Sequence, residues 1–202
     1  MHDPLTDLTR AIGAHLAHSN ASPQAAHAEI DHLQRAVRAA EVRPQYAAVP
    51  ARDYGAILGS AIDVGIETGI AAIATALGAL PRALPWDYQY SPRPGAGDLA
   101  RKIGFAELIG PDGPMDAPHC RVGFTLIAPN TLYPAHAHPA TELYLVISGH
   151  AEWSASGVRR IVPPGGFVLH QSNEPHAMRT FAEPLLALYS WSGDLDTAAF
   201  YL

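Results

Sequence analysis

Apolar side chains in the first part of the chain recur at the spacing of a helix. In the segment QAAHAEIDHLQRAVRAAE, Ile30, Leu33 and Val37 lie three or four positions apart, which places them on one helical face. The stretch 56–80 is rich in Ala, Gly and Ile and predicts a further packed helix. We therefore expect residues 1–80 to form a helical N-terminal region.

Beyond residue 80 the pattern changes to that of short strands. Runs such as FAELIG, ELYLVIS, GFVLH and EPLLALYSW are separated by turn sequences such as PDGP, SGH and PPGG. Many short strands at this spacing predict an antiparallel sandwich or barrel over residues 81–202. The Pro-, Gly- and aromatic-rich stretch 81–100 is expected to be an entry loop over that barrel.

Polar side chains share one face of a strand-like run, HAHPATELYLVISG. Residues two apart on a strand point to the same face, so we expect His136 and His138 to share one face, and Glu142 and Tyr144 to share one face. Buried polar groups without partners are costly, and a bound metal ion removes that cost. His176 follows a Gly-Gly turn and a short strand, and we expect it to reach the same interior. The pattern therefore predicts a metal site inside the barrel.

Composition narrows the class of protein. The chain has 202 residues and a formal net charge of −6, with scattered Lys and Arg, so neither a nucleic acid nor a membrane is an expected partner. Asp63 and Glu67 interrupt the apolar stretch 56–80 and argue against a membrane span. A single cysteine and the lack of a secretory signal pattern predict a cytoplasmic protein. Its apolar N-terminal helices could cap the barrel or pair two chains, so a monomer and a homodimer both stay open.

Two segments resemble the metal-binding motifs of the cupin superfamily. HAHPATELYLVISG resembles the first motif, and PPGGFVLHQSNEPHAM is similar to the second. The chain departs from the family pattern at Asn130, where the first motif has Gly, and at Thr180, where the second has Asn. The resemblance implies a mainly β fold with added helices, in which the helical region precedes a cupin barrel, a double-stranded β-helix of jelly-roll type.

A narrower resemblance, to the bacterial cupin-type dimethylsulfoniopropionate lyases, rests on Tyr133, Tyr144, Trp191 and the helical N-terminal extension. It implies a lyase that releases dimethyl sulfide and acrylate from a small zwitterionic sulfonium carboxylate. One divalent metal ion would be held by residues matching His138, Glu142, Tyr144 and His176. Zinc or iron is expected, and manganese, cobalt or nickel also suit such nitrogen and oxygen ligands.

The same resemblance suggests roles for the remaining site residues. A tyrosine acts as the base, and metal proximity would make phenolate accessible to Tyr144, with Tyr133 as the competing candidate. His136 matches a position beside the metal that contacts substrate. Aromatic faces attract a sulfonium cation, and they are available at Tyr133 and Trp191, with further ones from the entry loop at Trp86, Tyr88 and Tyr90.

Two other functions remain open from the residues alone. One is a different metal-dependent cupin enzyme, a dioxygenase or an isomerase, and the other is a non-catalytic metal- or ligand-binding cupin. His170 occupies a strand position that leaves both faces open, and we expect a structural or surface role for it.

Overall fold

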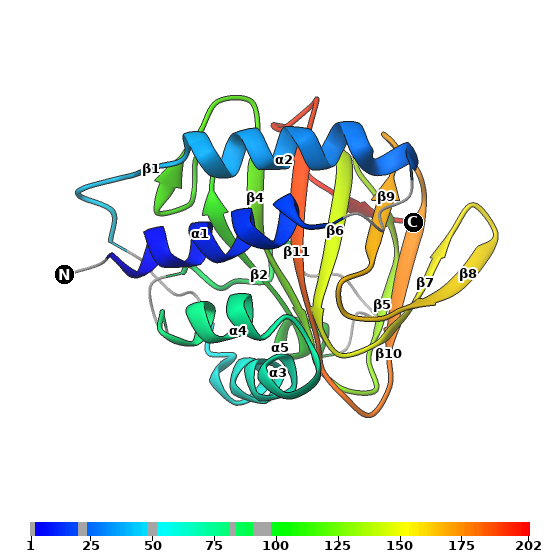
Figure 1. Ribbon diagram of the computed structural model, residues 1–202. Helices are drawn as coiled ribbons and strands as arrows, with labels where there is room; N and C mark the ends of the chain where they lie inside the picture. Colours follow the sequence, from blue (N-terminus) through cyan, green and yellow to red (C-terminus); the bar gives the residue numbers. More distant parts are fainter. Residues whose placement is uncertain (1–2, 20–23, 48–51, 81–83, 91–97) are drawn as a thin grey trace.

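The computed structural model describes residues 3–19, 24–47, 52–80, 84–90 and 98–202. Apart from the two-residue strand β1, helices come first along the chain and strands follow, as the sequence predicts (Figure 1). The helical elements are α1 (Pro4–Ala17), the short 3₁₀ helix η1 (Gln24–Ala26), α2 (His27–Ala39), α3 (Gly55–Thr68), α4 (Ala71–Gly78) and α5 (Leu99–Lys102).

The strands of the described part of the chain form two sheets, in the orders β1-β3-β2-β4-β11-β6-β9 and β12-β5-β10-β7-β8. Neighbouring strands are antiparallel apart from the short β2–β3 pair. Their bounds are β1 (Glu41–Val42), β2 (Ile103–Ile109), β3 (Met115–Asp116), β4 (Arg121–Ile127), β5 (Leu132–Ala137), β6 (Thr141–Ser148), β7 (Ala151–Ala155), β8 (Val158–Val162), β9 (Phe167–His170), β10 (His176–Thr180), β11 (Leu185–Ser192) and β12 (Phe200–Tyr201).

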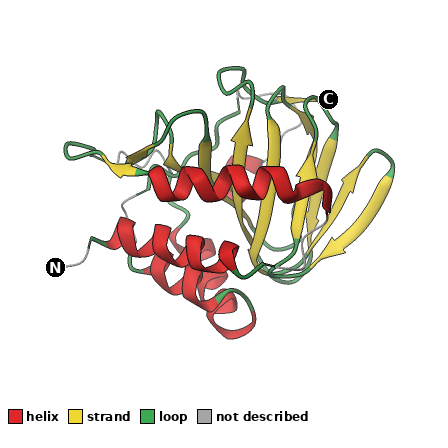
Figure 2. Ribbon diagram, turned by 45° about the horizontal axis from the view of Figure 1, so that its top comes forward, coloured by secondary structure: helices red, strands yellow, loops and turns green. Residues whose placement is uncertain are grey.

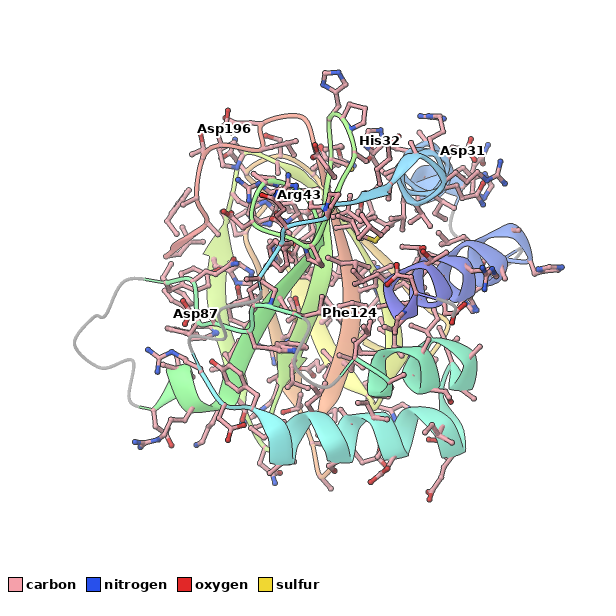
Figure 3. The ribbon with its side chains drawn as sticks, turned by 90° about the vertical axis from the view of Figure 1, so that its left-hand side faces the viewer. Asp31, His32, Arg43, Asp87, Phe124 and Asp196 are labelled. Carbon is pink, nitrogen blue, oxygen red and sulfur yellow. The ribbon has the colours of Figure 1, made fainter. Side chains whose placement is uncertain are left out.

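The molecule has three layers, with the larger sheet in the middle. Helices α1 to α4 cover one face of that sheet (Figures 1 and 2), and the smaller sheet covers the other. Phe124 of β4 is fully buried in the core that the sheet shares with the helices (Figure 3). The result is a cupin-like β-sandwich with a helical layer, which confirms the predicted fold class. The boundary near residue 80 remains a prediction, because helices and sheet share one core.

Strand β6 is buried on both faces, and each face packs against a different layer of the molecule. Leu143, Leu145 and Ile147 belong to the core beneath the helices, whereas Tyr144 and Val146 face the interior between the sheets. Side chains alternate along a strand, so the helical layer accepts one apolar set and leaves the other face for polar groups. The predicted alternation of β6 is confirmed.

The apolar stretch 56–80 is two helices where we expected one. Its break lies at Gly69, where the Ile70 N–H donates to the Ile147 carbonyl at 3.0 Å. A Cβ atom at Gly69 would lie 2.2 Å from that same carbonyl oxygen, so only glycine allows this close approach. Contact with the end of β6, which is invisible in the local pattern, ends the helix.

No helix in the described ranges is long and apolar enough to cross a membrane.

Both departures from the cupin motifs have a structural reason. Asn130 has a left-handed backbone with φ of 52°, a conformation that asparagine tolerates almost as glycine does. The Thr180 hydroxyl accepts from the Thr131 N–H at 2.9 Å and donates to the Ala128 carbonyl at 2.6 Å. The Asn130 N–H in turn donates to the Phe181 carbonyl, so both residues hold the turn before β5 against the end of β10.

The predicted entry loop is described only in part, because residues 81–83 and 91–97 lie outside the described ranges. Trp86 packs edge-on against Tyr54 at 6.3 Å in the helix-side core, so its predicted place over the site is wrong. Tyr88 and Tyr90 lie beside β12, where Tyr90 stacks on Tyr201 at 4.3 Å, and Tyr90 also lines the cavity between the sheets. Movement of this segment as a lid stays a prediction.

The turn after β6 yields a test of the fold. Gly149 has φ of 73°, and a Cβ there would lie 2.0 Å from the Pro184 carbonyl oxygen, whereas Gly157, with φ of 78°, has nothing within 4 Å. We expect Gly157→Ala to lower the free energy of unfolding by about 1–2 kcal/mol and Gly149→Ala by about 2–5 kcal/mol, because the second adds a clash to the left-handed strain. Denaturant titration measures both; equal losses would contradict this account.

Candidate metal centre

Three polar side chains from separate strands meet between the two sheets. His138 directly follows β5, Glu142 lies in β6, and His176 is the first residue of β10. Each is buried, and one donor atom from each lies within 4.8 Å of the other two. The Glu142 Oε2 atom is 2.9 Å from His138 Nε2 and 3.4 Å from His176 Nε2. These three residues form a group that could hold a metal ion.

The orientation of both imidazoles suits a cation. His138 Nδ1 lies 2.9 Å from the Ala140 carbonyl, and His176 Nδ1 lies 2.8 Å from the Glu174 carbonyl. A carbonyl only accepts, so Nδ1 carries the proton and a neutral ring presents the Nε2 lone pair to the interior. That lone pair faces a carboxylate oxygen, so a proton or a metal ion must lie between them.

His176 Nε2 is a buried atom without a hydrogen-bond partner among the described residues. An orphaned imidazole nitrogen is costly in a protein interior, and coordination would satisfy it. The donor set of two imidazoles and a carboxylate therefore fits a divalent metal of borderline softness.

Charge coupling within the group is strong. Burial alone would raise the pKa of Glu142, but its contacts with His138 and His176 outweigh burial and hold that pKa well below the usual range. Burial likewise opposes the charged form of His138, and the hydrogen bond and charge of Glu142 overcome it, raising the pKa of His138. Without metal, the carboxylate is ionised and a proton is drawn to His138.

Tyr144 lies two residues after Glu142 and lines the same cavity. Burial, followed by the nearby Glu142 carboxylate, raises the pKa of Tyr144 well above its ordinary value of 10.0. The phenol is therefore protonated at neutral pH in the metal-free chain. The roles of Tyr144 as metal ligand and base stay predictions.

His136 and Tyr133 stack on each other beside the metal-binding group. Their rings are 4.0 Å apart at 13°, and the Tyr133 hydroxyl is hydrogen-bonded to the Tyr90 hydroxyl. His136 Nδ1 lies 2.9 Å from the Pro134 carbonyl, and burial together with His176 lowers the pKa of His136 to about 3. A neutral imidazole and an aromatic face thus line the cavity; their predicted contact with substrate is untested.

Trp191 has a contact that the sequence does not reveal. Its indole N–H donates to Glu142 Oε1 at 2.7 Å, and its ring packs on His138 at 4.5 Å. Trp191 therefore orients a metal-binding carboxylate, in addition to lining the cavity. The cross-strand register of Trp191 and Glu142 produces this contact.

The cavity has a volume of about 400 Å³ and extends beyond the predicted residues. Glu107, Arg121 and Tyr189 also line it. The Glu107 carboxylate accepts a hydrogen bond from Arg121 at 2.8 Å. Glu107 and Arg121 could have been identified from the sequence, because each is a charged residue inside an apolar run, FAELIG or HCRVGFT. The segment after β11 also lines the cavity, and Figure 3 shows its Asp196 on the side of the molecule away from α3 and α4.

His170 is not at the surface, so that part of our expectation is wrong. The residue is only 1% exposed and pairs in register with Glu142 across β9 and β6. Burial, followed by His176, lowers the pKa of His170 to about 3, which keeps the ring neutral. The pairing of β9 with β6 placed this histidine inside.

The fold is a cupin-like β-sandwich, and the buried His/Glu/His group between its sheets is a candidate metal centre. Comparison with known proteins narrows the class further. Residues 21–187 match the dimethylsulfoniopropionate lyase family. The chain belongs to this family.

Individual relatives agree with that assignment. The chain is 35% identical over 138 residues to DddL of Cereibacter sphaeroides, whose name assigns it as a dimethylsulfoniopropionate lyase, and 35% identical over 132 residues to the dimethylsulfoniopropionate lyase DddQ of Ruegeria pomeroyi. These segments cover 67% and 65% of this chain, and only 57% and 66% of the two relatives.

Solved structures extend the similarity along the chain. The crystal structure of DddQ from Ruegeria pomeroyi DSS-3 superposes with a TM-score of 0.76 at 26% identity, covering 99% of this chain and 97% of that one. A structure from the work on the lyases RdDddP and RnDddQII gives the same TM-score at 25% identity, covering 98% and 97%. The helical layer is therefore shared, as well as the sandwich.

Proton competition generates one test of the site. Because Glu142 raises the pKa of His138 above its ordinary value of 6.5, that ring is already protonated at pH 6.5, and a metal ion must displace the proton. We expect the apparent Zn²⁺ dissociation constant to rise roughly tenfold per pH unit below the raised pKa. Chelator competition between about pH 8 and pH 5.5 measures it, and a constant affinity would contradict the predicted site.

The Trp191 contact generates a second test. Trp191→Phe removes the N–H donor to Glu142 and keeps an aromatic ring. We expect Zn²⁺ affinity to fall about 10-fold or more, the usual effect of removing an outer hydrogen bond to a metal ligand. Trp86→Phe, in the helix-side core, is the matched control and should bind Zn²⁺ as the wild type does. Unchanged affinity in Trp191→Phe would refute this role.

Proposed function

We propose that this protein is a metal-dependent carbon–sulfur lyase that cleaves dimethylsulfoniopropionate to dimethyl sulfide and acrylate. The observation that carries the proposal is the convergence of His138, Glu142 and His176 on one point, beside a cavity that His138, Glu142 and Tyr144 line. Membership of the dimethylsulfoniopropionate lyase family supports the substrate.

The reaction is a β-elimination. A base removes a proton from the carbon next to the carboxylate, the released electron pair forms the C=C bond of acrylate, and the C–S pair leaves with the sulfur as neutral dimethyl sulfide. A divalent ion held by His138, Glu142 and His176, with the Tyr144 oxygen as an added ligand, would supply Lewis-acid stabilisation of the developing negative charge and of phenolate. Zinc or iron fits these ligands, and manganese, cobalt or nickel are also compatible.

Tyr144 is our candidate for the base. Tyr144 lies two residues after Glu142 and lines the same cavity, so a metal ion held by Glu142 would stabilise its phenolate against the burial that otherwise favours the phenol. Tyr133 is the alternative base, but its hydroxyl is already hydrogen-bonded to the Tyr90 hydroxyl. We therefore assign Tyr133 chiefly to substrate contact.

The aromatic lining would receive the cationic end of the substrate. Tyr133 and Trp191 offer faces for a sulfonium, each contact stabilising it by about 0.5–2 kcal/mol. His136, held neutral, lies beside the metal-binding group and would contact the substrate without adding positive charge that repels the sulfonium. The partner is thus a small zwitterion, and the oligomeric state is either a monomer or a homodimer.

Headspace dimethyl sulfide is the direct assay. We expect metal-loaded wild-type protein to release dimethyl sulfide from dimethylsulfoniopropionate, and chelated protein to release none. Tyr144→Phe should lower kcat at least about 100-fold, the usual contribution of a general base. Tyr133→Phe should mainly raise KM.

A large loss of kcat in Tyr133→Phe, with activity retained in Tyr144→Phe, would show that Tyr133 is the base and would contradict our assignment. The absence of dimethyl sulfide from wild-type protein loaded with zinc, iron or manganese would refute the lyase proposal. Oxygen consumption by the iron-loaded protein would then favour a dioxygenase.

A further inference from the structure

The connection between β9 and β10 begins and ends with a histidine. His170 is the last residue of β9, and His176 is the first of β10. Their imidazole rings are stacked, with centroids 3.9 Å apart and planes at 10°. One of the two rings belongs to the candidate metal centre, and the other has no part in the proposed reaction.

Hydrogen bonding does not account for His170. Its side chain is buried, and among the described residues neither ring nitrogen has a hydrogen-bond partner. The nearest carboxylate oxygen, Glu174 Oε2, is 3.9 Å from Nδ1, which is beyond hydrogen-bonding distance. A buried donor without a partner is destabilising, so the residue needs another explanation. The closest ring neighbour of His170 is His176, whereas the ring centroids of Tyr144 and Trp153 are 6.2 Å away.

The rest of the connection restrains His176 at its edge. The Glu174 carbonyl accepts from His176 Nδ1 at 2.8 Å, which fixes one edge of the ring. The Glu174 carboxylate in turn accepts from the Gln171 N–H at 3.0 Å, and the Asn173 N–H donates to the His138 carbonyl at 2.8 Å. The backbone that carries His176 is thus tied to the backbone of the other imidazole ligand.

The faces of the His176 ring are restrained as well. His170 lies parallel to one face, and His136 approaches edge-on with ring centroids 4.1 Å apart at 62°. A single edge hydrogen bond still allows the ring to tilt about it, whereas a parallel neighbour at van der Waals distance opposes that tilt. The tilt matters because it moves Nε2 relative to the Glu142 oxygen, now 3.4 Å away.

We propose that His170 is a positioning residue, whose flat side chain stacks on His176 and holds its Nε2 atom toward Glu142 in the metal centre. The inference rests on the proposed metal site. It predicts that a planar side chain is required at position 170 and that the imidazole nitrogens are not.

Two variants separate shape from chemistry. His170→Leu removes the flat face at similar volume, and His170→Phe keeps a flat ring without nitrogens. We expect His170→Leu to raise the Co²⁺ dissociation constant about 10-fold or more and to alter the visible absorption of the bound ion, because the imidazole ligand is no longer held. His170→Phe should stay within about threefold of wild type. Chelator competition and Co²⁺ absorption report this without turnover.

Trp153→Phe is the matched packing control, because Trp153 lies on His170 at 6.2 Å and 28° and belongs to the same core. It should bind Co²⁺ as the wild type does. Thermal unfolding of the metal-free proteins checks folding, and His170→Met, flexible and not planar, replaces His170→Leu if that variant does not fold.

The outcomes are distinct. Wild-type affinity and absorption in His170→Leu would overturn the inference, and so would a His170→Phe variant as weak as His170→Leu. Failure of the wild-type protein to bind Co²⁺ would overturn the metal site itself. A metal-binding wild type that releases no dimethyl sulfide would refute the proposed reaction and leave the role of His170 intact.

Discussion

A buried, ionised carboxylate is the constraint on which the site depends. Glu142 is only 2% exposed, and an unpaired charge at such a position costs several kcal/mol. Compensation comes from the Trp191 indole N–H on one oxygen and from two imidazoles around the other. These partners reside on different strands of both sheets, so the site exists only when the sandwich is closed. The requirement to neutralise one carboxylate therefore links the global fold to the local chemistry.

The helical layer allows the larger sheet to carry polar groups on its other face without losing its apolar core. Because α1 to α4 cover one face, alternate residues of β6 and β11 bury aliphatic side chains there, and the opposite face is free to carry polar and aromatic groups. The shared use of both faces explains why the strands look almost continuously apolar while the site remains polar. The superposition with DddQ extends through the helices, in agreement with a layer that is integral to the fold.

Much of this was predictable from local patterns. The two-residue period placed Glu142 and Tyr144 on one face, and the helical period identified the N-terminal region. The resemblance to the cupin-type lyases then implied His138, Glu142 and His176 as metal ligands, and their donor atoms do converge. Asn130, at a departure from the family motif, has a left-handed backbone, the conformation that glycine adopts most readily.

What remained hidden depended on contacts between distant segments. His170 faces inward because β9 pairs with β6, and Trp191 meets Glu142 because β11 pairs with β6 in one register. The break at Gly69 depends on a carbonyl almost eighty residues further along the chain. Parity within one strand cannot reveal the register between strands, since a shift of one residue reverses every side chain.

The central claim is that a divalent cation is bound by His138, Glu142 and His176. Anomalous diffraction from crystals soaked in Zn²⁺ tests it most directly. The account predicts one dominant peak at about 2.0–2.2 Å from both Nε2 atoms and from a Glu142 oxygen. A dominant peak elsewhere, or no peak at saturating Zn²⁺, would contradict it.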